Sequence, residues 1–261
     1  MKKISLTIAA CLVGAVSQAQ LIDDFSDASL AEYTLSRVND ANGTSHISFS
    51  SPGGNLRVAH SGGSGHEQVL LLRSDYGLGI GQMLIADVLG SGAGWDRDLG
   101  IAVGFTATPT SLAGGASGDV RSSYVEVAFR SNNQVVSYAR NGVLNLASGQ
   151  EFAGSIYGGQ SFSGYVDSIF ITRPTATTFQ VGWTDGSTVH YLTPNGGPTL
   201  VYDVTTDTPG AAVGFYADLR AANAESPVGL DNLRIQAIPE PTSAALMGIS
   251  ALGLLFRLRR K

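Results

Sequence analysis

Cysteine and lysine are nearly absent from the 261-residue sequence. Cys11 is the only cysteine, so a chain that loses its N-terminal segment contains none, needs no disulfide and tolerates any redox compartment. No lysine occurs between Ile4 and Arg260, and residues 20–237 hold ten arginines against twenty Asp and Glu residues. The resulting formal charge of about −10 on this part of the chain disfavours nucleic acid as a partner.

Catalytic signatures are also scarce. The sequence has no Gly-x-Ser-x-Gly elbow and no His-Glu-x-x-His motif. Its four histidines are scattered, and the glycine-rich spacing between His60 and His66 favours a surface loop over a pair of metal ligands. Glu126 is the only glutamate well inside an expected strand, and it has no acidic neighbour there. These absences favour a protein that is not an enzyme.

The N-terminus has the three zones of a secretory signal peptide. Met1-Lys2-Lys3 is cationic, Ile4 to Val16 is apolar, and Ser17-Gln18-Ala19 supplies small residues before a cleavage point. We expect residues 1–19 to direct export through the secretion translocon, and signal peptidase to cut after Ala19. Ile8-Ala9-Ala10-Cys11 also matches a lipoprotein box, but the apolar segment before it would be marginally short.

The C-terminus is also built in three zones. The two prolines of Pro239-Glu240-Pro241 fix φ and remove backbone donors, which favours an exposed, extended linker. Ala244–Phe256 carries no charge and, as a helix, would be about 20 Å long, against about 30 Å for a bilayer core. Four cations that favour the cytoplasmic side of a membrane follow: Arg257, Arg259, Arg260 and Lys261. We therefore expect a short, temporary membrane helix; a helix packed on the soluble domain would need a polar face, which this segment lacks.

Residues 238–261 resemble the PEP-CTERM sorting signal of Gram-negative bacteria, because the Pro-Glu-Pro, the apolar helix and the Arg-rich end occur in that order. The resemblance implies recognition by an exosortase, an integral-membrane protease that removes the tail near Pro239–Pro241. It also implies a transient stay in the inner membrane, a final location outside the cell, and a link to exopolysaccharide and biofilm.

The segment between these signals, residues 20–237, reads as one all-β domain of short strands separated by turn residues. Asn141-Gly142 and Asp185-Gly186 are typical hairpin turns, and Ala28–Arg37 is the one internal segment that could be helical. Alternation puts Val125, Val127 and Phe129 on one face and Tyr124, Glu126 and Arg130 on the other. Many half-buried strands predict two packed antiparallel sheets, a sandwich or jelly roll. The expected strands are Leu21–Phe25, His46–Ser50, Asn55–Ala59, Gln68–Arg73, Met83–Val88, Leu99–Thr106, Ser123–Arg130, Gln134–Ala139, Val166–Thr172, Thr178–Thr184, Thr188–Leu192, Thr199–Val204, Ala212–Ala217 and Leu230–Gln236.

The order of these strands resembles the concanavalin A-like lectin and glucanase superfamily, which includes laminin-G-like domains. The motifs that carry the resemblance are Asp23-Asp24-Phe25, Ser123–Arg130, Gln134–Gly142, Phe179–Trp183, Val213–Ala217 and Leu230–Ile235. The resemblance implies pairing of the first and last strands, with a structural Ca²⁺ often near them. The superfamily contains sugar-binding modules, glucanases and adhesion domains, but this chain lacks the Glu-x-Asp-x-x-Glu pattern that its hydrolases often carry.

The sequence offers two candidate binding sites, one for Ca²⁺ and one for a sugar. Asp23 and Asp231 share the parity of apolar neighbours in their strands, so both are expected to point toward the core, where a carboxylate needs a cation or several donors. Together with Asp24 they are candidate Ca²⁺ ligands, the alternative being backbone or arginine partners. Trp95, Tyr124, Glu126 and Arg130 are candidate contacts for a sugar. The favoured function is non-enzymatic binding of polysaccharide; the alternatives are a polysaccharide hydrolase or lyase on the same fold and a purely structural adhesion protein.

Overall fold

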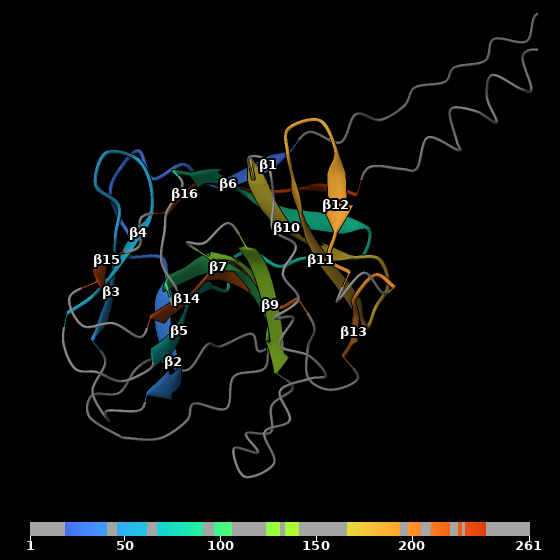
Figure 1. Cartoon of the computed structure of the whole chain (residues 1–261), viewed down its shortest axis with the longest axis horizontal. Helices are drawn as coiled ribbons and strands as arrows, with labels where there is room; N and C mark the ends of the chain where they lie inside the picture. The colour runs from blue at the N-terminus through green and yellow to red at the C-terminus, as the bar shows by residue number, and fades with distance from the viewer. Residues whose placement is uncertain are drawn as a thin grey trace, which may run out of the picture.

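The computed structural model describes residues 19–40, 46–61, 67–90, 97–105, 124–130, 134–140, 166–193, 198–204, 210–219, 224–225 and 228–238. These residues form sixteen strands and no helix. All strand pairs are antiparallel, and the strands build two large sheets and one small one (Figure 1). The expected all-β sandwich is therefore confirmed. The predicted signal and C-terminal helices lie outside the described residues.

The first large sheet has seven strands in the order β1-β16-β6-β10-β11-β12, with β13 also paired to β11. The expected pairing of the first and last strands, β1 and β16, is confirmed. The bounds of this sheet are β1 Gln20–Asp23, β6 Gln82–Leu89, β10 Ser168–Arg173, β11 Thr178–Thr184, β12 Val189–Tyr191, β13 Val201–Asp203 and β16 Gly229–Ala237.

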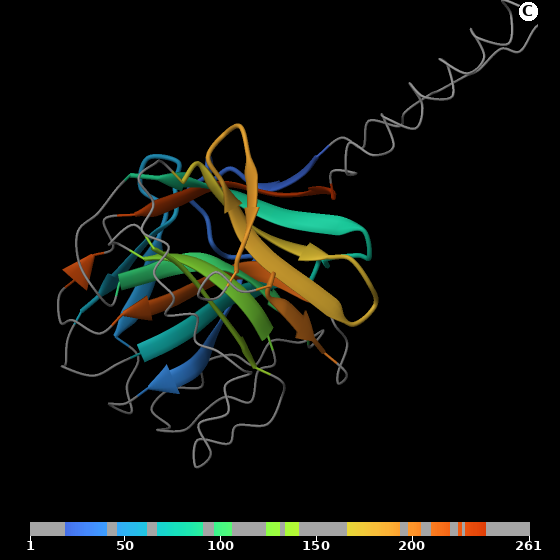
Figure 2. The ribbon, with the colours of Figure 1, turned by 45° about the vertical axis from the view of Figure 1, so that its right-hand side comes forward.

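The second large sheet has six strands in the order β2-β5-β14-β7-β8-β9. It packs face to face with the seven-stranded sheet (Figure 2). The bounds of this sheet are β2 Thr34–Asp40, β5 Glu67–Arg73, β7 Arg97–Gly104, β8 Tyr124–Arg130, β9 Gln134–Arg140 and β14 Ala212–Leu219.

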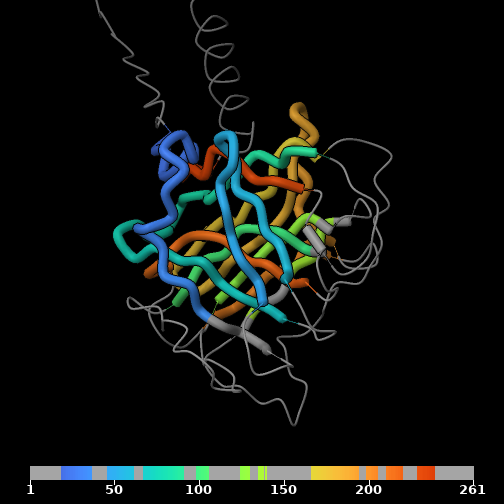
Figure 3. The backbone as a smooth tube through the Cα atoms, turned by 90° about the vertical axis from the view of Figure 1, so that its left-hand side faces the viewer, coloured from blue at the N-terminus to red at the C-terminus, as the bar shows by residue number. Residues whose placement is uncertain are grey.

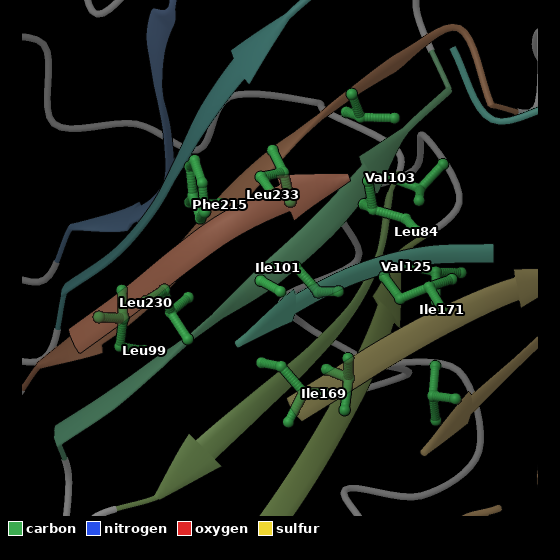
Figure 4. Close-up of a cluster of buried hydrophobic side chains, with 14 of the residues drawn as sticks. Leu84, Leu99, Ile101, Val103, Val125, Ile169, Ile171, Phe215, Leu230 and Leu233 are labelled. Atoms are coloured by element: carbon green, nitrogen blue, oxygen red, sulfur yellow. The ribbon is translucent and has the colours of Figure 1, made fainter. Parts of the chain in front are cut away.

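The core between the two sheets follows from alternation along each strand. Phe215 of β14 and Ile101 of β7 meet Leu84 and Ile169 from the opposite sheet, and all are almost fully buried (Figure 4). The inward assignment of Val125, Val127 and Phe129 is confirmed, and Trp183 is a core residue, 4% exposed.

The small third sheet closes one side of the sandwich. It consists of β3 Ile47–Ser50, β4 Arg57–His60 and β15 Ala224–Glu225, in the order β15-β4-β3. Ile47 and Val58 join the main core, and Leu56 bridges to Leu230 of β16. The hairpin β3–β4 runs across the front of the sandwich in Figure 3, and the residue before β3 contacts the start of β5, because the amide of His46 donates to Oε2 of Glu67 at 2.7 Å.

Each of the fourteen expected strands overlaps an observed one, and the structure adds two further strands, β2 and β15. Ala28–Arg37 is not helical: Phe25 and Ala28 adopt φ of 54° and 56°, turns follow, and a strand then begins at Thr34 and pairs with β5. The two-residue strand β15 was not expected at all. The turn at Asp185-Gly186 is confirmed, with Gly186 at φ 83°, whereas Asn141-Gly142 lies outside the described residues.

A β-bulge in β16 reverses the face expected for Asp231. Asn232 sits at φ 50°, and the register between β16 and β6 shifts between Asp231 and Arg234. Asp231 pairs directly with Asp87, which shares the parity of Met83 and Ile85 on the outer side of the sheet, while Leu230 is the core residue. The prediction that Asp231 points toward the core is therefore wrong, because the bulge adds a residue that the alternation did not include.

Candidate functional site

The outer face of the six-stranded sheet, which points away from the core, gathers most of the buried polar side chains of this sheet. The pleat sends Phe215 of β14 inward and Tyr216 and Asp218 outward. By the same alternation, Tyr124 and Glu126 of β8 lie on the outer face, whereas Val125 between them lies in the core. We define the outer face by these residues and by their register partners on β5, β7 and β9.

One end of the outer face carries a row of polar residues in direct register. Gln68 of β5 lies opposite Asp218 of β14, which lies opposite Asp98 of β7. The amide of Gln68 donates from Nε2 to Oδ2 of Asp218 at 2.9 Å. Asp98 and Asp218 are 0% and 1% exposed, so two carboxylates occupy neighbouring buried positions. The backbone of Arg130 continues this row on β8, although its side chain is outside the described part.

The middle of the outer face is aromatic and apolar. The rings of Tyr124 and Tyr216 stack with their centroids 6.0 Å apart and their planes 27° apart. They come from β8 and β14, which lie on either side of β7. Gly100 and Ala102 of β7 lie between the two strands, and a Cβ at Gly100 would collide with the backbone of Val127 and Ala128 on β8. The sequence therefore places a stacked pair of tyrosines over a strip of small residues.

Glu126 belongs to the same face and is fully buried. Its register partners are Ala102 on β7 and Tyr138 on β9. A buried carboxylate is costly unless polar groups or charges compensate it, so a solvated glutamate at this position is excluded. The structure thus brings together the predicted sugar contacts Tyr124 and Glu126, and places the backbone of Arg130 in the same strand. Trp95 lies outside the described residues.

The predicted calcium ligands are not brought together. Asp23 lies opposite the core residue Leu233, so it does point inward, but protein donors satisfy it. Its Oδ1 accepts the amide of Phe25 at 2.7 Å, and its Oδ2 accepts the hydroxyl of Tyr33 at 2.9 Å. Asp23 and Asp231 consequently sit on opposite sides of the seven-stranded sheet, and Asp24 is exposed.

Local donors also account for the other two carboxylates. Asp24 accepts the amide of Ser26, and the hydrogen bonds from Ser26 lower the pKa of Asp24. Asp231 accepts the amide of Asn232 at 2.7 Å. These three residues do not form a shared oxygen cage in the described structure, and calcium binding stays a prediction.

Sequence reasoning missed Asp98 and Asp218, the two carboxylates of the polar row. Each lies at the edge of an expected strand, and each has the outward parity that the alternation already assigned to Tyr124 and Glu126 on the neighbouring strand. That parity could have identified both as outer-face residues. Their proximity could not be predicted, because it requires knowing that β14 inserts between β5 and β7.

A model of the PEP-CTERM protein-sorting motif matches residues 237–261. The chain carries a PEP-CTERM sorting signal. The expected sorting signal at 238–261 is thereby confirmed, and it implies processing by an exosortase and delivery to the cell surface through a transient membrane-anchored state. Among the described residues, no helix is long and apolar enough to cross a membrane, and Ala244–Phe256 and Pro239–Pro241 lie outside them.

Several solved β-sandwich domains are loosely similar to the chain. The calcium-bound exoplasmic domain of VIP36 is 11% identical, with a TM-score of 0.47 over 87% of this chain and 93% of that one. The carbohydrate recognition domain of Emp47p is 14% identical, with a TM-score of 0.43 over 84% and 94%. A mutant of the alginate lyase Aly36B is 13% identical, with a TM-score of 0.38 over 86% and 100%. No curated protein sequence matches the chain, and the proposals below rest on its own residues.

Proposed function

We propose that this protein is a surface protein of a Gram-negative bacterium that binds polysaccharide of the extracellular matrix without cleaving it. The sorting motif at residues 237–261 is the observation that carries the location. The outer face of the six-stranded sheet is the proposed binding surface. Its stacked tyrosines and buried carboxylates supply the two kinds of contact that sugars need, an aromatic plane and fixed hydrogen-bond acceptors.

The charge of this face selects the class of polysaccharide. Asp98, Asp218 and Glu126 are acceptors when ionised, and they suit the hydroxyl donors of a neutral sugar. The chain around them is also strongly acidic. An acidic polysaccharide would bring like charges together at close range. We therefore expect neutral or amino-sugar polymers to be preferred over uronic acid polymers.

Burial of the outer face adds a condition on access. Tyr216 and Glu126 are 0% exposed in this conformation, and the described members of the apolar cluster around Tyr216 all come from strands of its own sheet. A sugar can reach these groups only after the face opens. We therefore expect slow association with polysaccharide, limited by a conformational step and not by diffusion.

A binding assay with matched aspartate variants tests this surface. Full-length protein in mild detergent is titrated with neutral, amino-sugar and acidic polysaccharides by calorimetry. Asp218→Asn is expected to weaken binding about tenfold or more, in line with the loss of a charged hydrogen bond. The exposed Asp185 lies in the turn between β11 and β12 of the seven-stranded sheet, and Asp185→Asn is expected to bind as the unaltered protein does. Equal binding by both variants, or no binding by the unaltered protein, would overturn the proposed surface.

A tail deletion tests the location separately. Removal of residues 238–261 should abolish the membrane-anchored precursor and release an unprocessed protein, which cell fractionation and mass determination detect. A matched substitution of Glu240 by Ala tests the motif with the apolar segment intact. Unchanged processing and fractionation in the deletion strain would contradict the exosortase route while leaving the binding proposal standing.

Polysaccharide cleavage is the second candidate, because the structure places Asp98 and Asp218 directly opposite each other. Directly paired residues on antiparallel strands have Cβ atoms about 5 Å apart, close to the carboxyl separation of about 5 Å in retaining glycosidases. Release of reducing ends, or of unsaturated products in the case of a lyase, would favour this candidate. Loss of that activity in Asp98→Asn and Glu126→Gln would assign it to the outer face, and a chain that neither binds nor cleaves polysaccharide would fit a purely structural adhesion protein.

A further inference from the structure

Three side chains meet beside the small sheet: His46, which immediately precedes β3, His60 of β4 and Glu67 of β5. Nδ1 of His46 lies 2.5 Å from Oε1 of Glu67, and Nε2 of His60 lies 3.8 Å from the same oxygen. The ring centroids of the two histidines are 5.4 Å apart. One donor atom from each residue lies within 4.8 Å of the other two. Among the described residues this is the only such group of three histidines, cysteines or acids.

The hairpin β3–β4 and the start of β5 create this meeting point. Ile47 pairs with His60, and the amide of Ser61 donates to the carbonyl of His46 at 3.0 Å, so the two histidines flank the open end of one hairpin. Glu67 is the first residue of β5 and pairs with Leu219 of β14. The cluster therefore joins the small sheet to the six-stranded sheet.

His60 is the member of this cluster whose ring nitrogens make no hydrogen bond within the described part of the protein. Its side chain is 0% exposed, and neither ring nitrogen has a hydrogen-bond partner among the described residues. A buried imidazole without partners loses its hydration and gains nothing in exchange. The backbone of His60 is fixed on both sides, by Ile47 of β3 and Ala224 of β15, so the ring cannot easily turn out to solvent.

Glu67 is held so that one oxygen faces both histidines. Its other oxygen, Oε2, accepts the amides of His46 and Ile47 at 2.7 and 3.3 Å. These two bonds orient the carboxylate, as outer partners commonly do for metal ligands. The Glu67 side chain is 1% exposed, whereas the His46 side chain is 24% exposed. Solvent thus reaches the cluster from the side of His46.

The donor distances suit a small transition-metal ion after a modest adjustment. Ligand atoms about 2.1 Å from a tetrahedral ion lie about 3.4 Å apart. The two measured distances to Oε1, 2.5 and 3.8 Å, lie on either side of that value. Movements on the order of 1 Å, mainly by the half-exposed His46, would place an ion between all three residues.

We infer that His46, His60 and Glu67 bind a divalent transition metal, with Zn²⁺ as the best match. Two imidazoles and one carboxylate form a donor set that zinc sites use, and Ca²⁺ and Mg²⁺ prefer oxygen ligands alone. Three protein ligands would leave a fourth position for water, and solvent reaches the cluster at the 24% exposed His46 side chain. The ion ties β3, β4 and β5 together and gives the buried ring of His60 a partner. This inference is independent of the proposed polysaccharide binding.

Calorimetry on the untagged full-length chain in mild detergent tests the site after treatment with a chelator. The unaltered protein should bind one equivalent of Zn²⁺ and no Ca²⁺ at the same concentration. His46→Ala and Glu67→Gln are each expected to weaken Zn²⁺ binding about 10- to 100-fold. Co²⁺ in place of Zn²⁺ should give visible d–d absorption of four-coordinate strength, and that signal should be lost in both variants.

His190 provides the matched control, because it is a part-exposed histidine paired with a carboxylate, Asp185, in the other sheet. His190→Ala should bind Zn²⁺ as the unaltered protein does. His46 is the safer of the two ligand histidines to replace, since it is half-exposed, and circular dichroism verifies that each variant is folded. Absence of Zn²⁺ binding by the unaltered protein, or equal binding by the His46→Ala, Glu67→Gln and His190→Ala proteins, would overturn the inference.

Discussion

Replacing Tyr33 with Phe isolates one buried hydrogen bond that supports the start of the chain. The Tyr33 hydroxyl donates to Oδ2 of Asp23 at 2.9 Å, and its ring packs against Phe215 with the centroids 5.7 Å apart. Phenylalanine keeps the ring contacts and removes only the hydroxyl. Oδ2 of Asp23 then loses its donor, while Oδ1 keeps the amide of Phe25. A hydrogen bond to a charged group contributes about 1.5–3 kcal/mol, so we expect the free energy of unfolding at pH 7 to fall by that amount.

The same bond predicts a dependence on alkaline pH. Burial, followed by the charge of Asp23 and the hydrogen bond to it, raises the pKa of Tyr33 far above its ordinary value. The unfolded tyrosine titrates near pH 10, so the stability that Tyr33 contributes is complete below about pH 10 and declines as pH rises beyond it. At pH 11 the unfolded form gains about 1.4 kcal/mol from ionising this residue. The difference between the unaltered protein and Tyr33→Phe should therefore shrink by about 1.4 kcal/mol between pH 9 and pH 11.

Urea unfolding at pH 7, 9 and 11, followed by the fluorescence of the buried Trp183, measures both effects. Tyr191→Phe is the control, because burial also raises the pKa of Tyr191 but its hydroxyl makes no hydrogen bond to Asp23. Its stability at pH 7 should change by less than about 0.5 kcal/mol. The reasoning is refuted if Tyr33→Phe is as stable as the unaltered protein at pH 7. It also fails if the difference between the two proteins stays constant up to pH 11.

Three further predictions concern other parts of the fold. Phe215→Ala removes a fully buried ring from the core and should lower the free energy of unfolding by about 3–5 kcal/mol in the same assay; a loss below 1 kcal/mol would contradict the packing. Hydrogen bonds, first from His190 and then from the amides of Thr188 and Ser187, lower the pKa of Asp185. Its contribution to the β11–β12 turn is thus present above about pH 4 and lost as pH falls, so the protection of the Thr188 amide, taken relative to its intrinsic exchange rate at the same pH, should fall in acid and in Asp185→Asn; unchanged protection would mean that other contacts hold the turn. Asn232→Val should cost about 1–2 kcal/mol because of the positive φ, whereas Asn232→Gly should be nearly neutral; thermal unfolding that shows equal losses would argue against the bulge.

Alternation along single strands predicted most of the local structure. It placed Val125, Val127 and Phe129 in the core because the period of two is a property of the strand itself. Alternation does not predict the order of strands in a sheet, because that order depends on contacts between residues far apart in the sequence. β14 pairs with β5 and with β7, and neither partner is adjacent to it in the chain. The polar row of Gln68, Asp218 and Asp98 exists only because of that arrangement.

Two local features changed what alternation predicted for the acidic residues. At Asp23 the parity was right, but the compensation comes from Tyr33, which lies in the one internal segment that the sequence allowed to be helical. At Asp231 the bulge moved the side chain from the core face to the outer face of the sheet. The paired Asp87 accepts a hydrogen bond from the guanidinium of Arg234 at 2.7 Å and one from the side-chain amide of Asn232 at 3.0 Å. A calcium site built on parity alone therefore assumed two regular strands where the chain has a turn and a bulge.

The histidine cluster shows a further limit of spacing arguments. Short metal motifs are recognisable because one helix or one turn places the ligands, whereas His46, His60 and Glu67 are separated by a whole hairpin and the loop that follows it. Their approach depends on the register of Ile47 with His60 and on the position of β5, and the sequence does not state either one. What the sequence does offer is a histidine in a strand whose neighbours are apolar, a position that leaves the imidazole unhydrated once the strand is buried. The burial of His60, with no hydrogen bond to either ring nitrogen, therefore points to this cluster where the distance between histidines along the chain does not.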